Sequence, residues 1–337
     1  MAVAAHDLTQ LEERVRKAAG VPTRTGDGVV ELLPGSLREV ARAQAVKGML
    51  GQDAERVVVS LVAFDRIEAP DPAACTIRVG AGANLGEVEA TLQGWALTLG
   101  WLSPKARSLT VRDWLEGRHA GLRAVPGNRL ESAALSLGVA LRSGGLFVTP
   151  AAPRSSGGPM LETLFLGRGG QAGTLVEAQL RALPRPELEE TFHALVERPE
   201  DVVLLLRGVA ASDVRPVEVH TRRKGRGFAV AITVATYAFR ARRDRALVEG
   251  LLKGRGEPRA VGQVGGGAPE FEGELGWDRL AGAIGSAGPL GIYRIARESV
   301  VVAARAPVKG AVALDSPPEP LPAPLLGILD GAGQEVA

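Results

Sequence analysis

Residues 164–186 read LFLGRGGQAGTLVEAQLRALPRP, and this stretch decides the fold. The segment from position 167 to position 173 holds four glycines, which predicts an irregular loop. The next ten residues, TLVEAQLRAL, predict a strand that closes the unit. The composition changes at Pro184-Arg185-Pro186, and we predict a domain boundary there.

Upstream of this loop, capping signals and apolar runs predict alternating helices and strands. Asp7 begins a first helix that stops at Gly20, and Ser36 with Glu39 forms an S-x-x-E capping box before a second. Asn84 begins a third helix in the same way. The predicted helices are residues 7–20, 36–50 and 85–92, and the predicted strands are residues 29–34, 56–63, 76–79, 133–142 and 146–149.

Downstream of the boundary, the sequence predicts a second α+β unit. Residues 217–221 and 228–237 are expected to be antiparallel strands, and residues 240–253 an amphipathic helix. A further helix at 277–284 and a strand pair within 291–305 complete the unit. The predicted domains are residues 1–186 and 187–316, followed by a proline-rich, extended tail at 317–337.

Three ordered blocks carry a family resemblance. The first is TIRVGAGANLGEVEATLQGWALTLGW at 76–101, the second is SLTVRDWLEGRHAGLRAVPGNRLESAAL at 108–135, and the third is the glycine loop at 164–186. In this order they resemble the FAD-linked oxidases of the vanillyl-alcohol oxidase type, nearest the alkyl-dihydroxyacetonephosphate synthase and glycolate oxidase FAD-subunit branches. The resemblance covers residues 29–186 and extends weakly to about residue 237 and the following helix.

The resemblance implies an α+β protein with a PCMH-type FAD-binding fold. Two subdomains would clasp the cofactor, and a small antiparallel α+β cap would follow them. It also implies a flavin-dependent oxidase or dehydrogenase that acts on a hydroxy acid or a lipid-like substrate. The short C-terminal part leaves room for a partner subunit that completes the active site.

The same resemblance assigns a cofactor site. Residues without Cβ let backbone N–H groups approach a pyrophosphate and a flavin ring closely, which explains the glycine-rich loops of the family. Residues 167–175 would hold the adenine and phosphate side, and residues 108–114 would face the ring. The predicted cofactor-binding residues are Gly80, Gly82, Ser108, Thr110, Val111, Gly121, Gly127, Gly167, Gly170, Gly173, Thr174, Leu175 and Glu177.

Departures from the family pattern keep a second hypothesis open. Arg112 and Asp113 stand where the flavin loop has paired glycines, and Pro126 stands where it has a tyrosine. The phosphate-binding loop expected between the second helix and the next strand is missing. The alternative is therefore a pseudoenzyme that keeps the fold as a binding or assembly module, with Arg112 and Asp113 plugging the flavin site. Whether the chain is an enzyme stays open at this stage.

Composition argues against several other classes of protein. The 337 residues include 40 Lys and Arg against 38 Asp and Glu, so the net charge of +2 predicts no commitment to nucleic acid. The lone Cys75 excludes an internal disulfide and a cysteine-built metal site, and we expect it to be a buried core thiol. Leu85 stands where the third glycine of a dinucleotide fingerprint would follow Gly80 and Gly82, which argues against a Rossmann NAD site.

The sequence gives only general indications of the cellular compartment and of catalytic residues. No run approaches about 18 apolar residues, so we expect no membrane span, and the acidic N-terminal stretch is unlike a signal peptide. A cytoplasmic protein is the expectation. The four histidines, at positions 6, 119, 193 and 220, look scattered and predict no catalytic base. The basic run HTRRKGRGF at 220–228 predicts a solvated hairpin loop.

Overall fold

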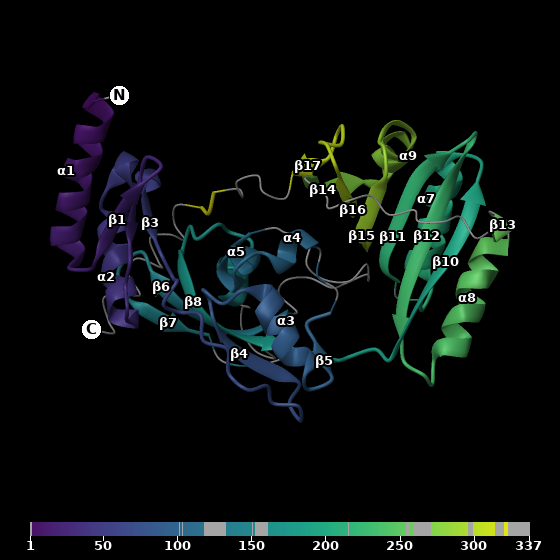
Figure 1. The fold of residues 1–337 in the computed structure, drawn as a ribbon, viewed down its shortest axis with the longest axis horizontal. Coiled ribbons are helices and arrows are strands. Elements are labelled where there is room, and N and C mark those ends of the chain that lie inside the picture. Colours follow the sequence, from purple (N-terminus) through teal and green to yellow (C-terminus); the bar gives the residue numbers. More distant parts are fainter. Residues whose placement is uncertain are drawn as a thin grey trace.

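The computed structural model describes residues 2–100, 102, 104–117, 133–149, 151, 161–214, 216–253, 257–258, 271–295, 299–313 and 320–322. Mixed helices and strands form three groups that lie in a row (Figure 1). An N-terminal group holds the first small sheet, a central group holds an antiparallel sheet, and a C-terminal group holds the largest sheet. We call the C-terminal group, residues 188–313, the cap.

The N-terminal group packs two helices against a sheet of order β1-β2-β3. Strands β1 and β2 are antiparallel, whereas β2 and β3 are parallel. The apolar stripe of the first helix is buried at Leu11 and Val15, and Gly20 ends the helix with a φ of +63°. The elements are α1 (Ala2–Ala19), β1 (Thr23–Gly26), β2 (Val29–Leu32), α2 (Leu37–Gly48), the 3₁₀ helix η1 (Gly51–Arg56) and β3 (Val57–Val59).

The central group is built on an antiparallel sheet of order β4-β8-β6-β7. A short pair, β5 with β9, and three helices accompany it. The elements are β4 (Thr76–Gly80), α3 (Leu85–Gln93), β5 (Leu97–Thr98), α4 (Pro104–Arg107), α5 (Val111–Glu116), β6 (Ala134–Leu141), β7 (Leu146–Val148), the 3₁₀ helix η2 (Leu161–Leu164), β8 (Gly173–Arg181) and β9 (Leu183–Pro184).

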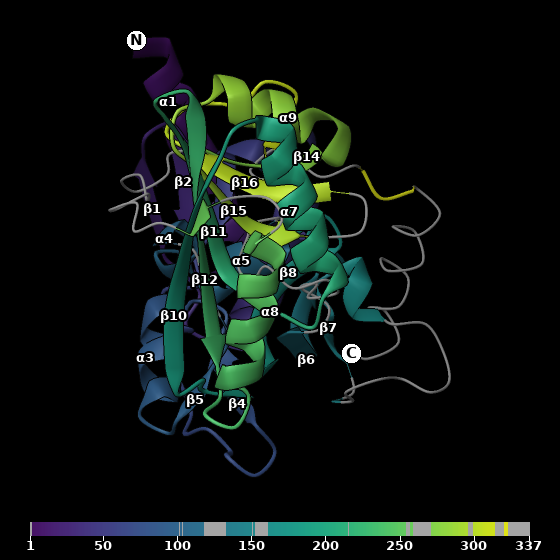
Figure 2. The same ribbon diagram turned by 90° about the vertical axis from the view of Figure 1, so that its right-hand side faces the viewer.

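The cap is an antiparallel sheet of order β13-β10-β12-β11-β15-β16-β14-β17. Figure 2, which views the molecule from the cap side, shows α7 and α8 packed along its strands. The elements are β10 (Leu188–Val196), α7 (Pro199–Ala211), β11 (Pro216–Lys224), β12 (Gly227–Thr236), α8 (Ala241–Lys253), β13 (Glu257–Pro258), β14 (Phe271–Gly276), α9 (Trp277–Ser286), β15 (Leu290–Ile295), β16 (Ser299–Ala304) and β17 (Val312–Ala313).

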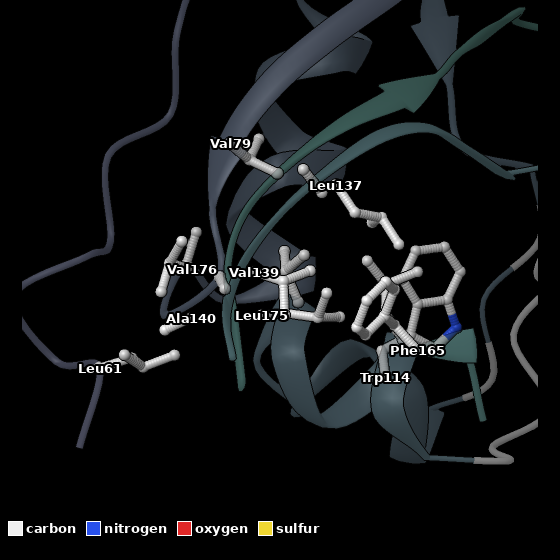
Figure 3. Packing of buried hydrophobic residues seen from close by; sticks show 14 of the residues in the cluster. Leu61, Val79, Trp114, Leu137, Val139, Ala140, Phe165, Leu175 and Val176 are labelled. Atoms are coloured by element: carbon white, nitrogen blue, oxygen red, sulfur yellow. The ribbon is translucent and has the colours of Figure 1, made fainter. Parts of the chain in front are cut away.

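Strand β8 organises the core of the central group because its two faces are both buried. Leu175 faces the side where Trp114 of α5 packs beside Phe165, and Val176 faces the other side with Leu61 (Figure 3). One hydrophobic cluster therefore joins the N-terminal and central groups, and it includes residues from Leu11 to Ala182 together with Leu321. A second cluster lies within the cap and runs from Ala194 to Val308.

Several local predictions agree with the structure. The Ser36 hydroxyl accepts a hydrogen bond from the Glu39 N–H (3.4 Å), and the Glu39 carboxylate accepts one from the Gly35 N–H (2.7 Å). Asn84 caps α3 through the N–H groups of Gly86 and Glu87. The predicted hairpin appears as β6 and β7, and the predicted closing strand as β8.

Other predictions were wrong. Asp7 lies inside α1 instead of capping it, and its carboxylate accepts a hydrogen bond from Arg56 (2.8 Å). The strand predicted at 56–63 is confined to Val57–Val59, and the chain beyond it follows an irregular path. Cys75 is only partly buried and has a φ of +51° in the turn before β4. Strands β1 and β10 and helix α7 were not predicted.

Among the described helices, none is long and apolar enough to cross a bilayer.

Candidate functional site

We define the seam as the contact of α2 and residues 57–66 with α5, β8 and the β6–β7 turn. Here the backbone of residues 61–66 lies directly on two predicted cofactor residues, Gly80 and Gly82. The Gly80 N–H donates to the carbonyl oxygen of Arg66 (2.8 Å), and the Gly82 N–H to that of Phe64 (2.9 Å). A Cβ at Gly82 would lie 2.0 Å from the Leu61 carbonyl oxygen. These glycines therefore allow one protein segment to approach another.

The counterpart of the flavin loop is a short helix, α5, where a loop was expected. Thr110 is its N-cap, and its hydroxyl accepts a hydrogen bond from the Asp113 N–H (3.1 Å). The Val111 N–H donates to the carbonyl oxygen of Ala83 (2.8 Å). Thr110 and Val111, which were expected to face a flavin ring, thus form the start of α5. Val111 also bonds to Ala83 in the turn that follows β4.

Arg112 and Asp113, which replace the paired glycines of the family, differ in their contacts and in their exposure to solvent. The Arg112 N–H donates to the Ala81 carbonyl oxygen (2.8 Å), and its guanidinium donates to the Val59 carbonyl oxygen (2.9 Å). Asp113 is more exposed and pairs with Arg112 at 3.2 Å. The Arg112 side chain is 23% exposed, so it lies within the seam instead of pointing into solvent.

The predicted phosphate loop wraps around the end of α5. Its Gly167 and Gly169 N–H groups donate to the carbonyl oxygens of Leu115 and Glu116, both at 2.8 Å. The Leu175 N–H donates to the side-chain carboxylate of Glu116, also at 2.8 Å. The Glu116 carboxylate therefore lies beside the glycine loop, where the family resemblance predicts a phosphate group.

Helix α2 closes the seam from the N-terminal group. The buried Gln44 amide donates a hydrogen bond to the Thr174 hydroxyl of β8. In the β6–β7 turn, Gly144 has a φ of +91°, and a Cβ there would lie 3.1 Å from the Cβ of Ala45. The helix and the turn are in direct contact, and the positive φ makes any residue with a Cβ strained at Gly144.

The charges in the seam are unusual. Enclosure of its carboxyl group by protein raises the pKa of Glu116 to about 7, although the Leu175 N–H, Arg112 and Lys47 act to lower it. The Asp113 carboxylate adds to the rise. Burial lowers the pKa of Lys47, and the nearby positive charges of Arg112 and Arg142 add to this effect.

The structure brings most of the predicted cofactor residues to the seam or its immediate borders. Ser108 lies just before the α5 cap, and Glu177 lies in β8 opposite Gly80 and Gly138. Gly121 and Gly127 lie outside the described residues. Many of the predicted backbone donors bond to protein acceptors, namely the N–H groups of Gly80, Gly82, Ser108, Val111, Gly167, Gly173 and Leu175.

This arrangement does not fit FAD. An N–H group has one hydrogen, so a donor that already bonds to a carbonyl or a carboxylate is not available to a pyrophosphate or a flavin ring. Binding of the cofactor in the expected place would require residues 61–66 and the Glu116 carboxylate to move. We derive no chemical step through FAD for this reason.

Sequence reasoning missed three residues of the seam: Gln44, Lys47 and Glu116. Gln44 and Lys47 are three residues apart in α2, so they lie on one face of that helix. Glu116 lies two residues after Trp114 of the Thr-Val-x-x-Trp block, and an acid so close to the expected flavin loop was the available signal.

The cap brings together two histidines that looked scattered in the sequence. In the register of the sheet, His193 of β10 and His220 of β11 both pair with Ala231 of β12. They share the face opposite the cluster that includes Ile232, because side chains alternate along a strand. The Nδ1 atom of His193 is buried and has no hydrogen-bond partner within the described segments, and Nε2 of His220 lies 3.3 Å from Glu218.

The described residues combine mixed helices and sheets in an N-terminal group, a central group and the cap. No protein-family model matches the chain. Two crystal forms of alkyldihydroxyacetonephosphate synthase have a similar structure. The P212121 form matches with a TM-score of 0.65 at 15% sequence identity. The P1 form matches with a TM-score of 0.62 at 14% sequence identity. The matches cover 81% of this chain and 66% and 68% of those chains.

The chain thus spans about two thirds of the length of these synthases. At such identities the likeness is one of fold. It extends beyond the region of the sequence resemblance, because 81% of the chain cannot be matched within residues 29–186 alone.

Proposed function

We propose that this protein uses the FAD-linked oxidase fold without the cofactor, as a binding or assembly module. The observation that carries the proposal is the state of the predicted cofactor donors. Their N–H groups bond to residues 61–66, to the end of α5 and to the Glu116 carboxylate, and Arg112 spans the seam. A cofactor-binding cleft leaves such donors free for its ligand.

The proposal includes a division of the chain into two domains, residues 1–186 and 187–316. Their separate hydrophobic clusters support it. The module would act in the cytoplasm, and a partner subunit would contact it. The partner subunit follows from the family resemblance, and the compartment follows from the N-terminal sequence and the lack of a long apolar run.

The first experiment is a visible absorption spectrum of the purified protein, repeated after incubation with excess FAD and desalting. We expect no flavin band in the visible region, because a protein without a cofactor does not absorb there. A flavin retained in stoichiometric amount would overturn the proposal.

A flavin-dependent oxidoreductase is the second candidate, and the cap favours it. His193 and His220 lie on one sheet face with only the small Ala231 between them, and this face could present acid–base groups to a small substrate. The hydroxy acid or lipid-like substrate of this alternative comes from the family resemblance alone.

A double variant, Arg112→Gly with Asp113→Gly, separates the two candidates. If these residues help to close the site, the variant gains flavin affinity, because the seam loses the Arg112 side chain and the bond to Val59. If they belong to a working flavin site, the variant binds FAD no better than the wild type. Titration of FAD by fluorescence quenching measures the difference.

A further inference from the structure

The hairpin of β11 and β12, near the middle of the cap sheet, ends in a run of positive charge (Figure 2). Positions 222–226 read RRKGR, so four of these five residues are cations. The register pairs Lys224 with Gly227, which leaves a two-residue loop, and Gly225 begins this loop with a φ of +61°. Loops of this length with glycine in the first position make a tight turn between twisted strands. The cations are therefore held by a regular hairpin.

The hairpin extends beyond the strands on either side of it. Strand β15 pairs with β11 only as far as Thr221, and β10 pairs with β12 only as far as Phe228. Arg222 and Arg223 therefore lie past the end of β15, and Arg226 in the turn lies past both neighbouring strands. Arg223 and Arg226 are exposed, and Arg222 is partly exposed. The end of the hairpin is thus accessible to a partner.

The positive charge is present on both faces of this ribbon. Arg223 lies opposite Phe228, which belongs to the hydrophobic cluster of the cap, and its guanidinium is 5.6 Å from the centre of that ring. Arg222 lies opposite Ala229, so its side chain leaves the other face of the sheet, because side chains alternate along a strand. Arg226 adds a cation at the tip.

The protein does not neutralise this charge with acids of its own. Among the described residues, Arg222, Arg223 and Arg226 have no ion-pair partner within 4 Å. In the same cap, three arginines within residues 240–245 pair with acids. A carboxylate brought to the hairpin would relieve the repulsion among the cations and could accept two parallel hydrogen bonds from one guanidinium.

We propose that the end of this hairpin, residues 222–226, is the docking site for an acidic segment of a partner protein. Clusters of arginines recognise acidic motifs in many complexes. A hairpin that is already fixed in shape loses little conformational freedom on binding, so more of the interaction energy contributes to affinity. The inference rests on the proposed function, because an assembly module requires a partner, and it names the chemistry of that partner.

Two observations favour an acidic protein over a nucleic acid. Proteins that bind single strands stack the bases on accessible aromatic rings, whereas Phe228 is 3% exposed and lies beneath Arg223. Proteins that bind duplexes spread their cations along a face that follows the phosphates. Here an acid, Glu197, lies next to the hairpin, since a Cβ at Gly227 would be 3.6 Å from its Cα atom. The short positive region matches a compact group of carboxylates.

The test is fluorescence anisotropy of a labelled oligoglutamate peptide, titrated with the full-length protein at low ionic strength. We compare the wild type with Arg223→Gln/Arg226→Gln and with a control, Lys17→Gln/Arg38→Gln, which removes the same charge from exposed positions on α1 and α2. We expect the hairpin variant to bind at least about fivefold more weakly and the control to stay within about twofold of the wild type. If the double variant does not fold, Arg226→Gln alone decides, with an expected loss of about twofold to threefold.

A wild type that does not bind the peptide would overturn the inference, as would equal losses in the hairpin and control variants. Single-stranded RNA and duplex DNA are titrated in parallel, and tighter binding of either one that depends on the hairpin would also overturn it. The flavin spectrum is recorded on the same samples. Stoichiometric FAD in the wild type refutes the proposed function, whereas peptide binding that is insensitive to the hairpin refutes only the docking site.

Discussion

The guanidinium of Arg112 and the carbonyl oxygen of Val59 are 2.9 Å apart, and their hydrogen bond joins α5 to the last residue of β3. Val59 is buried in the N-terminal group, whereas Arg112 belongs to the central group. The residue that replaces a flavin-loop glycine is therefore a structural link between subdomains. A glycine at this position could not make the link.

The Arg112→Ala variant should lose stability. A hydrogen bond from a charged donor to a partly buried carbonyl contributes about 1–2 kcal/mol, and its removal leaves the Val59 oxygen without this donor. Urea denaturation followed by circular dichroism measures the change. Arg66→Ala is the control, since its side chain is 82% exposed and its pairing with Glu68 is a surface contact. Equal stabilities of the two variants would contradict a role of Arg112 in the seam.

Glu116 predicts a specific pH dependence of the free energy of unfolding. Its pKa is raised from 4.5 to about 7 in the folded protein, so the folded state binds the proton more tightly than the unfolded state. The stabilising contribution is complete below about pH 4.5 and is lost as the pH rises to about 7. At pH 8 the free energy of unfolding of the Glu116→Gln variant should exceed that of the wild type by about 1–3 kcal/mol. The lower end of this range allows for screening by solvent, because the Glu116 side chain is partly exposed.

Urea denaturation of the wild type and Glu116→Gln at several pH values between 4.5 and 8 tests this expectation. The two curves should converge at the acidic end and separate toward pH 8. Glu55→Gln, which changes an exposed acid, should follow the wild type throughout. Parallel profiles for Glu116→Gln and the wild type would show that the carboxyl group is not enclosed in the folded protein.

The Gly82→Ala variant should be severely destabilised. A Cβ placed 2.0 Å from the Leu61 carbonyl oxygen forces the backbone of residues 61–66 away from β4, at a cost of about 2–4 kcal/mol. The matched control is Gly26→Ala, because nothing lies within 4 Å of a Cβ at Gly26. Thermal unfolding compares them. A mild effect at Gly82 would mean that this segment does not rest on β4, and the cofactor site would then be more open than described.

The segment at residues 320–322 gives a fourth prediction. Leu321 is 6% exposed and belongs to the hydrophobic cluster of the N-terminal and central groups, and its N–H donates to the Gln171 side chain (2.7 Å). The Leu321→Ala variant should lose about 1–3 kcal/mol of stability. Val312→Ala in the cap, where the side chain is 55% exposed, should change little. Denaturation curves that coincide for both variants would contradict the packing of Leu321.

Local signals predicted a large part of the fold. The Asn84 cap, the Ser36–Glu39 box and the hairpin of β6 and β7 depend on residues close together in the sequence, and each was found at the expected place. The chain also shares its fold with the synthases, whose structures it matches at TM-scores of 0.65 and 0.62. Gly80 and Gly82 in the first block lie where the backbone of residues 61–66 approaches most closely.

The state of the site could not be predicted in the same way. A glycine pattern is equally compatible with a close ligand and with a close protein segment, and only the path of residues 61–66 decides between them. The bond of Glu116 to Leu175 links residues far apart in sequence. His193 could not be placed near His220 because β10 was not predicted, and without that strand the register of the sheet was unknown.

The return of Leu321 to the hydrophobic cluster of the N-terminal and central groups has a consequence for the chain during synthesis (Figure 1, yellow segment beside the central group). A ribosome releases the chain from the N-terminus, so the cap emerges before residue 321 does. The core that begins with Leu11 therefore receives this buried side chain only after the whole cap has been synthesised. A chain that ends upstream of Leu321 lacks this side chain and the hydrogen bond to Gln171, and its core should be less stable by about 1–3 kcal/mol.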